Sequence, residues 1–233
     1  MDMVKFLSFG DNSHRIAEAD SVAVIGLGRF GSSLALELMA SGTEVLGIDA
    51  SEEVVQDHNA RLTQVVRADA TKEEVLRQLA IDEFDRAVVA IGHDIKASIL
   101  VASLLLQLKV PVIWAKALDE QHGRILEQLG VQHVVYPEKD MGRRVAHLVR
   151  GAAADYLELE PGFAIIKTGV PSELHGRPLG ETDLRQRHGV TVAAHRRPQG
   201  SWKTADNSTV LGVKETILVI GQTREVEAFA QLR

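Results

Sequence analysis

The chain has 233 residues, a formal net charge of -6 and no cysteine. The lack of cysteine excludes disulfides, thiolate metal sites and a cysteine nucleophile, and the acidic balance disfavours nucleic acid as a partner. No apolar run reaches the ~18 residues of a membrane span, and residues 1–15 lack the apolar core of a signal peptide. These observations predict a cytoplasmic protein.

Six short runs rich in Val and Ile alternate with helical patterns along the first part of the chain. The runs are SVAVIG, EVLGID, TQVVRAD, RAVVAIG, VPVIWAKA and QHVVYP. The helices expected between them cover residues 30–40, 52–60, 72–79, 95–108 and 119–129. Apolar runs without polar alternation are typical of parallel strands covered on both faces. We therefore predict an α/β fold, with a Rossmann-like doubly wound parallel sheet over residues 21–138.

The pattern changes in the second part of the chain. A connecting crossover helix is expected within residues 139–154, followed by the short β-like pieces YLELE, FAIIKT, VTVAAH and TILVIG. Brief helices are expected near residues 182–186 and 224–232. We predict a small α+β domain over residues 155–233. Residues 1–20 are an N-terminal extension for which the sequence predicts no element.

A glycine-rich turn follows the first predicted strand. Gly26, Gly28 and Gly31 satisfy the pattern G-x-G-x-x-G, in which the glycines allow a tight turn, close approach of a pyrophosphate, and close packing of helix on strand. The amides that open the next helix would face the phosphates. Asp49 stands 18 residues after Gly31, at the end of the second strand, where a carboxylate meets ribose hydroxyls. The pattern favours a nucleotide site over a structural turn, and Asp49 disfavours NADP.

Other loops follow the carboxyl ends of neighbouring strands and converge on the same crevice. The candidate residues on them are Ala50, Ser51, Asp69, Ala70, Thr71, Ile91, Gly92, His93 and Lys116. Asp69 either contacts a ligand or caps the helix that starts near residue 72, and the two roles are compatible. Arg29 is either a solvated arginine or a bidentate partner for additional phosphate charge, as in ATP.

The sequence shows no evident catalytic cluster. His175, His188 and His195 are scattered, and neither G-x-S-x-G nor a P-loop lysine motif is present. Glu138 either starts a helix, where the helix dipole favours an acid, or shares a divalent cation with the phosphates of a nucleotide. A nucleotide sensor is therefore expected rather than an enzyme. The alternatives are an NAD(H)-binding redox sensor, a small NAD-dependent oxidoreductase, and a transcription regulator, for which no helix-turn-helix or basic face is visible.

The segments VIGLGRFGSSLALEL, ADAT, VAIGHDIKAS, VPVIWAKA and LGVQHVVYPEKDMGRRVA resemble the cytosolic KtrA/TrkA-type subunits of bacterial potassium uptake systems, which are RCK (regulating conductance of potassium) proteins. The resemblance runs from about residue 21 to the end, and G-L-G-R-F-G with P-E-K-D-M-G points to the KtrA branch. It implies an N-terminal and a C-terminal RCK domain, and homodimers assembled into an octameric ring. The ring would gate a KtrB-type membrane channel subunit at the inner face of the membrane, with ATP favouring the active state and ADP the inactive one. NAD(H) is the less favoured ligand.

The resemblance also implies residue roles. The residues that match the phosphate loop are Gly26, Gly28, Arg29, Phe30 and Gly31. Within this loop Arg29 would sense the terminal phosphate, while Asp49 matches the ribose acid. Glu138 matches a glutamate that holds a divalent cation, such as Mg²⁺ or Ca²⁺, at the dimer interface. Arg185 and Val192 match residues that contact cyclic di-AMP in some relatives, whereas Thr191 stands where an asparagine is common and offers a shorter hydroxyl.

Overall fold

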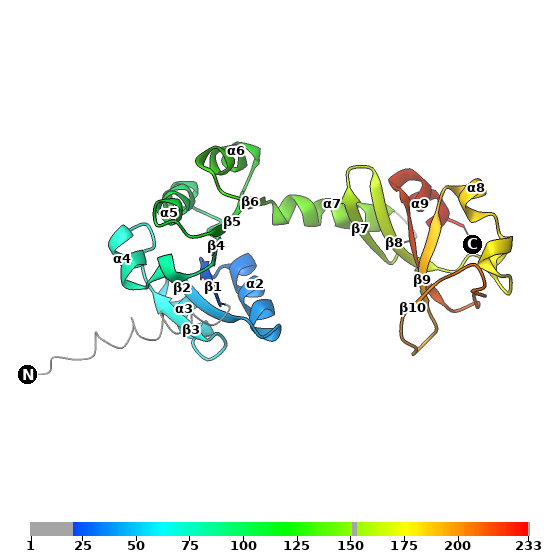
Figure 1. The fold of residues 1–233 in the computed structure, drawn as a ribbon, viewed down its shortest axis with the longest axis horizontal. Helices are drawn as coiled ribbons and strands as arrows, with labels where there is room; N and C mark the ends of the chain where they lie inside the picture. The colour runs from blue at the N-terminus through cyan, green and yellow to red at the C-terminus, as the bar shows by residue number, and fades with distance from the viewer. Residues whose placement is uncertain (1–20, 151–152, 233) are drawn as a thin grey trace, which may run out of the picture. The chain divides into compact units, whose positions relative to one another are not determined.

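The computed structural model describes residues 21–150 and 153–232. The expected N-terminal extension, residues 1–20, lies outside the described residues, and so do residues 151 and 152 of the connecting segment. The chain divides into two compact units, of which the first ends at Glu138 and the second begins at Lys139 (Figure 1).

A six-stranded parallel sheet forms the centre of the N-terminal unit (Figure 1). Its strands are β1 (Ser21–Ile25), β2 (Glu44–Asp49), β3 (Gln64–Arg67), β4 (Arg86–Val89), β5 (Val112–Lys116) and β6 (His133–Val135). Their order in the sheet is β3-β2-β1-β4-β5-β6, because β1 pairs with both β2 and β4. This order confirms the predicted Rossmann-like sheet. The strands after β1 are added first on one side of it and then, from β4 on, on the other side, and such folds open a crevice at this switch between β1 and β4.

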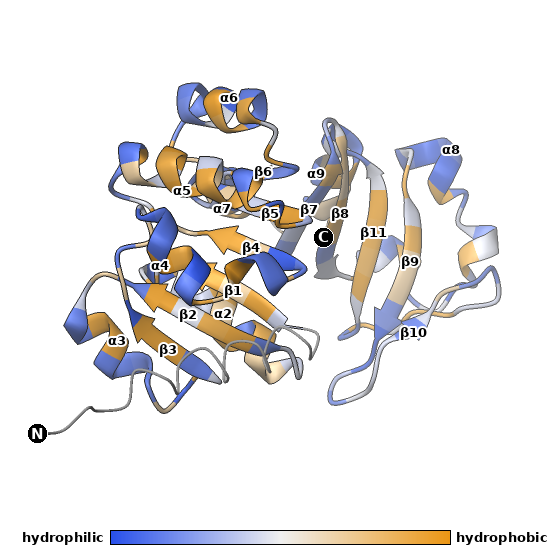
Figure 2. Cartoon of the chain, turned by 60° about the vertical axis from the view of Figure 1, so that its left-hand side comes forward, coloured by the Kyte–Doolittle hydropathy of each residue, from blue (hydrophilic) through white to orange (hydrophobic). Residues whose placement is uncertain are grey.

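Helices cover both faces of this sheet. They are α2 (Arg29–Ala40), α3 (Glu52–His58), α4 (Glu73–Gln78), α5 (Ile95–Gln107) and α6 (Glu120–Leu129), with a 3-10 turn η1 (Ile81–Glu83) before β4. Val22 and Val24 of β1 join a core cluster with α2 and α3, whereas Ala23 and Ile25 join a second cluster with α4, α5 and α6. Figure 2 shows β1, β2 and β4 as largely hydrophobic. Burial on both faces explains the unbroken apolar runs.

Two glycines shape the turn between β1 and α2. Gly26 has a φ of 95°, and a Cβ there would stand 3.1 Å from the Ala90 carbonyl carbon. A Cβ at Gly31, in the first turn of α2, would overlap the carbonyl oxygen of Gly26. The turn can therefore be this tight only because both positions lack a side chain.

An antiparallel sheet with the order β10-β9-β11-β8-β7 forms the C-terminal unit. Its strands are β7 (Asp155–Glu160), β8 (Phe163–Gly169), β9 (Thr191–Arg196), β10 (Lys203–Thr204) and β11 (Thr216–Gln222). The helical elements are α7 (Pro137–Arg150), whose first two residues belong to the N-terminal unit, η2 (Ser172–Leu174), η3 (Leu179–Glu181), α8 (Leu184–His188) and α9 (Thr223–Ala230). Buried residues alternate along β8 and β11, and their core cluster includes Val226 and Phe229 of α9.

The predicted α+β class is therefore confirmed for this unit, with two local differences. The short helix predicted near residues 182–186 begins at Leu184, because Asp183 takes a left-handed conformation with a φ of 51° that ends the preceding turn. The sequence does not predict β10, which has only two residues and therefore carries no recognisable alternation.

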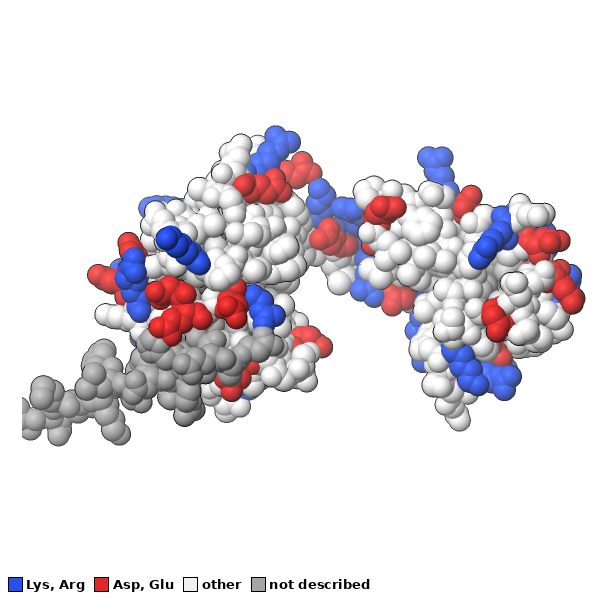
Figure 3. All heavy atoms as spheres, viewed as in Figure 1, with Lys and Arg blue, Asp and Glu red and all other residues white. Residues whose placement is uncertain are grey.

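The described residues include no helix with both the length and the hydrophobicity needed to cross a lipid bilayer. On the face that Figure 3 shows, acidic and basic side chains are interspersed over the N-terminal unit. The described residues of the N-terminal unit form no broad basic surface on this face, of the kind that a nucleic-acid backbone attracts.

We expect Gly31→Ala to lower the free energy of unfolding of the N-terminal unit by about 2 kcal/mol, because the added methyl group would overlap a backbone oxygen. Urea unfolding followed by the fluorescence of Trp114, in a Trp202→Phe background, measures it. Gly28→Ala is the control: nothing lies within 4 Å of that methyl position, so at most about 1 kcal/mol of helix capping is lost. Equal losses in both variants would contradict the steric argument.

Candidate functional site

A cleft of 510 Å³ lies at the carboxyl ends of the parallel strands in the N-terminal unit. This volume is within the range of small-molecule sites. The predicted site residues that line it are Gly26, Gly28, Asp49, Ala50, Ser51, Asp69, Ala70, Thr71, Ile91, Gly92 and His93. Four strand-to-helix loops thus meet at one place, as the topology of a doubly wound sheet requires.

The cleft also has an apolar wall that the motifs do not reveal. Val54 of α3 and Ala97 and Val101 of α5 line it together with the loops. Their helical spacing in the sequence marks these residues only as core positions, so no sequence signal separates them from the other buried side chains of their helices. Such a wall could contact a flat apolar group such as a nucleobase.

Asp49 anchors the glycine turn. The Leu27 N–H donates to its Oδ2 at 2.7 Å, and the Ser51 N–H donates to its Oδ1 at 2.9 Å. The carboxylate therefore holds the turn against the end of β2, a structural role that the motif alone does not disclose. Each oxygen keeps a further lone pair, so Asp49 could still accept hydrogen bonds from two hydroxyl groups of a ligand.

Gly28 is the one glycine of the motif for which the fold gives no reason. It has a φ of -65°, which any residue can adopt, and nothing lies within 4 Å of its Cβ position. Gly28 is also the N-cap residue of α2 and makes no side-chain capping bond, so the first amides of that helix remain available. Because Gly28 borders the cleft, close approach of a ligand would account for its lack of a side chain.

Asp69 closes a turn and does not cap α4. Its Oδ1 accepts from the Thr71 hydroxyl at 2.6 Å and from the Thr71 N–H at 3.1 Å. The N-cap of α4 is Lys72, with no capping bond from a side chain. The capping role considered for Asp69 is therefore wrong, because the turn over residues 69–72 uses its carboxylate. The hydroxyl of Thr71 is the main cause that lowers the pKa of Asp69.

Lys116 and Glu138 form an ion pair beside the glycine turn. The Lys116 side chain is 8% exposed, and its Nζ donates to Glu138 Oε1 at 2.5 Å. The same Nζ lies 5.8 Å from the centre of the Phe30 ring. The hydrogen bond from Lys116 lowers the pKa of Glu138, and the charge of Arg29 acts in the same direction. Lys116 thus pairs directly with an exposed acid, on which Arg29 acts only through its charge.

Of the site residues predicted in the N-terminal unit, five do not line the cleft. They are Arg29, Phe30, Gly31, Lys116 and Glu138. Gly31 packs against the Gly26 carbonyl group and so allows the turn to be tight. Lys116 and Glu138 form the ion pair, and the Phe30 ring lies near the Lys116 ammonium group. Among the residues that the structure describes, no group of three or more acids or histidines could hold a metal ion. Within one chain, the cation next to Glu138 is the ammonium group of Lys116.

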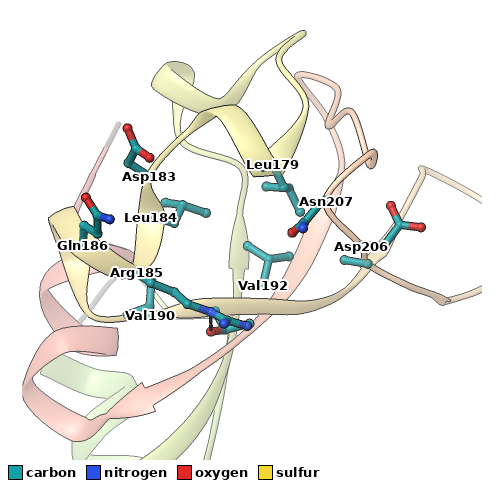
Figure 4. Close-up of a pocket in the computed structure, with 12 residues that line it drawn as sticks. Leu179, Asp183, Leu184, Arg185, Gln186, Val190, Val192, Asp206 and Asn207 are labelled. Atoms are coloured by element: carbon teal, nitrogen blue, oxygen red, sulfur yellow. Dashed lines mark hydrogen bonds between the residues drawn. The ribbon is translucent and has the colours of Figure 1, made fainter.

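A second pocket, of 250 Å³, lies in the C-terminal unit (Figure 4). It brings together the three residues predicted there, Arg185, Thr191 and Val192. The Nε of Arg185 donates to Thr191 Oγ1 at 3.0 Å. The hydroxyl that departs from the expected asparagine therefore orients the guanidinium group. Figure 4 shows Asn207 on the wall of the pocket that lies opposite Arg185.

The two units correspond to two known domain families. Residues 22–137 match the TrkA-N domain, and residues 163–232 match the TrkA-C domain. The chain therefore belongs to the family of TrkA-type potassium uptake proteins, which confirms the resemblance. It is 35% identical to the Ktr system potassium uptake protein C of Bacillus subtilis (strain 168), over 89% of this chain and 94% of that protein. It is 36% identical to the Ktr system potassium uptake protein A of Vibrio alginolyticus, over 85% of this chain and 91% of that protein.

Solved structures agree on the fold. The crystal structure of the GsuK RCK domain is similar over 91% of this chain, with a TM-score of 0.64 and 17% identity. The GsuK channel bound to NAD is similar over 89% of this chain, with a TM-score of 0.63 and 17% identity. This chain covers 47% and 38% of those two chains. At such identity the likeness shows the fold alone.

We expect Thr71→Val to raise the pKa of the Asp69 carboxyl toward its ordinary value, because the largest lowering cause is removed. A depressed folded-state pKa contributes stability that is present above the unfolded pKa and is lost as the pH falls through the folded pKa. The variant should therefore lose less stability on acidification than the wild type.

Carboxyl-carbon NMR titration measures both pKa values in the same samples. Lys116→Met is the matched variant: it should raise the pKa of Glu138 and leave that of Asp69 where it was, because Lys116 is the main cause at Glu138 only. If either variant raised the pKa of both carboxyls by the same amount, these local assignments would be contradicted.

Proposed function

We propose that this chain is a regulatory subunit of a Ktr-type potassium transporter, which binds adenine nucleotides in its N-terminal cleft and thereby controls K⁺ flux through a membrane subunit. The observation that carries the proposal is the coincidence of two facts. The chain shares 35% identity over 94% of a Ktr system potassium uptake protein. Its cleft is bordered by a glycine that the fold itself does not require.

The residues of the cleft suit a nucleotide. Gly28 and the uncapped first amides of α2 would meet the phosphates, and Asp49 has lone pairs left for ribose hydroxyls. The apolar wall from α3 and α5 would contact the adenine ring. We propose ATP and ADP as the ligands, with NAD(H) as the alternative that the same residues would also admit.

Arg29 favours ATP. It is exposed at the start of α2, and its charge acts on Glu138 next to Lys116. An additional phosphate beside Gly28 would meet this concentration of positive charge, whereas the nicotinamide half of NAD carries no further phosphate. We propose that Arg29 reads the terminal phosphate, in its own chain or in an adjoining one.

The roles of the acids in the cleft are consistent with a protein that binds a nucleotide without catalysing a reaction on it. Asp49, Asp69 and Asp94 each accept a backbone N–H hydrogen bond from the loop or helix start that they shape. Such carboxylates hold the site together. A ligand in this cleft would act by fitting two conformations unequally and shifting their populations. We therefore propose a regulatory protein and not an oxidoreductase.

The output of such a sensor requires assembly. We propose homodimers arranged in an octameric ring, held at the inner face of the membrane by a KtrB-type channel subunit. We also propose that a divalent cation, Mg²⁺ or Ca²⁺, is shared between Glu138 and the nucleotide phosphates. Because one chain supplies a single carboxylate there, already paired with Lys116, further ligands would come from the nucleotide or from a second chain.

The pocket of the C-terminal unit is proposed as a site for cyclic di-AMP. Arg185 is held by Thr191 with its guanidinium group in the pocket, where it could bind a phosphate. Val192 would meet a base. The amide of Asn207, on the opposite wall, could supply the hydrogen bonds that Thr191 does not.

Calorimetric titration with ATP, ADP, NAD, NADH and cyclic di-AMP tests the ligands. We expect Gly28→Ala to weaken nucleotide binding about tenfold, the effect of one misfitting methyl group, while the fold remains intact. Cyclic di-AMP binding should be unchanged in this variant and lost in Arg185→Gln. Binding of NADH alone, or nucleotide binding unaffected by Gly28→Ala, would overturn the proposed nucleotide site.

Arg29→Gln separates ATP from ADP. We expect a loss of about 10- to 100-fold for ATP, the effect of one charge-assisted hydrogen-bonded pair, and a much smaller loss for ADP. Arg61→Gln, which removes an exposed arginine elsewhere in the unit, is the control and should change neither affinity. Flux of K⁺ into proteoliposomes that contain a Ktr-type membrane subunit should then depend on ATP for the wild type and lose that dependence with Arg29→Gln.

A further inference from the structure

The hairpin that joins β9 to β10 is strongly basic, although the whole chain carries a net charge of -6. Residues 193–205 contain no acid and include Arg196, Arg197 and Lys203. The tip between the strands is Pro-Gln-Gly-Ser, which is uncharged. Figure 3 shows Lys and Arg side chains gathered at this end of the C-terminal unit. We refer to residues 195–203 as the basic hairpin.

An aromatic side chain lies among these cations. Trp202, one of the two tryptophans in the chain, is 38% exposed. The guanidinium carbon of Arg196 lies 5.1 Å from the centre of its ring, which is a cation–π contact. The basic hairpin therefore presents an amphipathic indole next to several positive charges.

A buried acid fixes the base of the basic hairpin. Glu215 is 7% exposed, and its carboxylate accepts from the Nδ1 of His195 at 2.7 Å and from the Nε of Arg197 at 3.3 Å. The side chain of Arg197 nevertheless remains 76% exposed. Glu215 thus holds the hairpin in place and leaves the guanidinium group of Arg197 accessible to a partner.

We propose that the basic hairpin docks on an anionic lipid surface. Indole rings settle at the headgroup level of a bilayer, and Lys and Arg side chains nearby are attracted to anionic lipids. An acidic peptide would be held by the cations alone and would not require an exposed tryptophan. This proposal rests on the proposed function, which brings the chain to a membrane, where several weak hairpin contacts in one assembly would reinforce each other.

Co-sedimentation of the full chain with vesicles tests the docking. The wild type should bind vesicles of phosphatidylcholine that contain about 40% phosphatidylglycerol, because these have a strongly anionic surface. It should not bind vesicles of phosphatidylcholine alone. The triple variant Arg196→Gln, Arg197→Gln, Lys203→Gln should bind about 100-fold more weakly, since each basic side chain is worth about fivefold. The matched control, Arg61→Gln, Lys96→Gln, Arg124→Gln, removes three exposed cations from the N-terminal unit and should bind as the wild type does.

The fluorescence of Trp202 decides between a membrane and a protein partner. In a Trp114→Phe background, its emission should shift to the blue on anionic vesicles and stay unchanged with polyglutamate. Equal losses in the two triple variants, or vesicle binding without a spectral shift, would overturn the proposal. An emission change with polyglutamate but not with vesicles would overturn it in favour of an acidic protein. Calorimetry with ATP on the hairpin variant keeps the two proposals apart, because nucleotide binding should be retained.

Discussion

The carboxylate of Asp49 is the constraint on which the N-terminal site depends. By accepting the N–H groups of Leu27 and Ser51, it joins the end of β1 to the end of β2. The Gly26 N–H adds a bond to the Ile48 carbonyl at 2.8 Å, so the glycine turn is attached to β2 by both backbone and side chain. A turn held this firmly presents the start of α2 to the cleft in one fixed orientation. The site is thus preorganised by the same acid that would bind its ligand.

The ion pair of Lys116 and Glu138 connects this site to the rest of the chain. Lys116 ends β5, whereas Glu138 stands in the first turn of α7, the helix that runs on into the C-terminal unit. A ligand phosphate near Lys116 and Arg29 would compete with Glu138 for their positive charge. The strength of this pair, and with it the hold on the start of α7, would then vary with the charge of the bound nucleotide. Such competition is a physical route from ligand identity to conformation.

The sequence predicts the parts of this arrangement that arise from local patterns. Continuous apolar runs identify the six parallel strands, and the glycine spacing together with Asp49 locates the cleft. Contacts between distant residues leave no such pattern: Lys116 and Glu138 are 22 residues apart, and nothing in either neighbourhood indicates a pair. For Asp69 a local pattern misleads instead. An acid before a helix is typical of an N-cap, yet the Asp69 carboxylate accepts a hydrogen bond from Thr71, two residues later, and forms a turn. The apolar wall is likewise invisible, since Val54 and Val101 satisfy the helical pattern of ordinary core residues.

Acids have a similar role in both units, and this determines where anions can bind. In the N-terminal unit the cleft acids hold backbone amides, while in the C-terminal unit Glu173 and Glu215 hold the side chains of Arg187 and Arg197. Burial raises the pKa of Glu215, but the hydrogen bonds from His195 and Arg197 outweigh this effect and leave its pKa below the ordinary value. Its negative charge is thus kept inside the fold, next to the base of a hairpin whose cations face solvent. An acidic chain can therefore still attract anionic partners at this hairpin, because the buried Glu215 contributes to the net charge without covering the exposed Arg197.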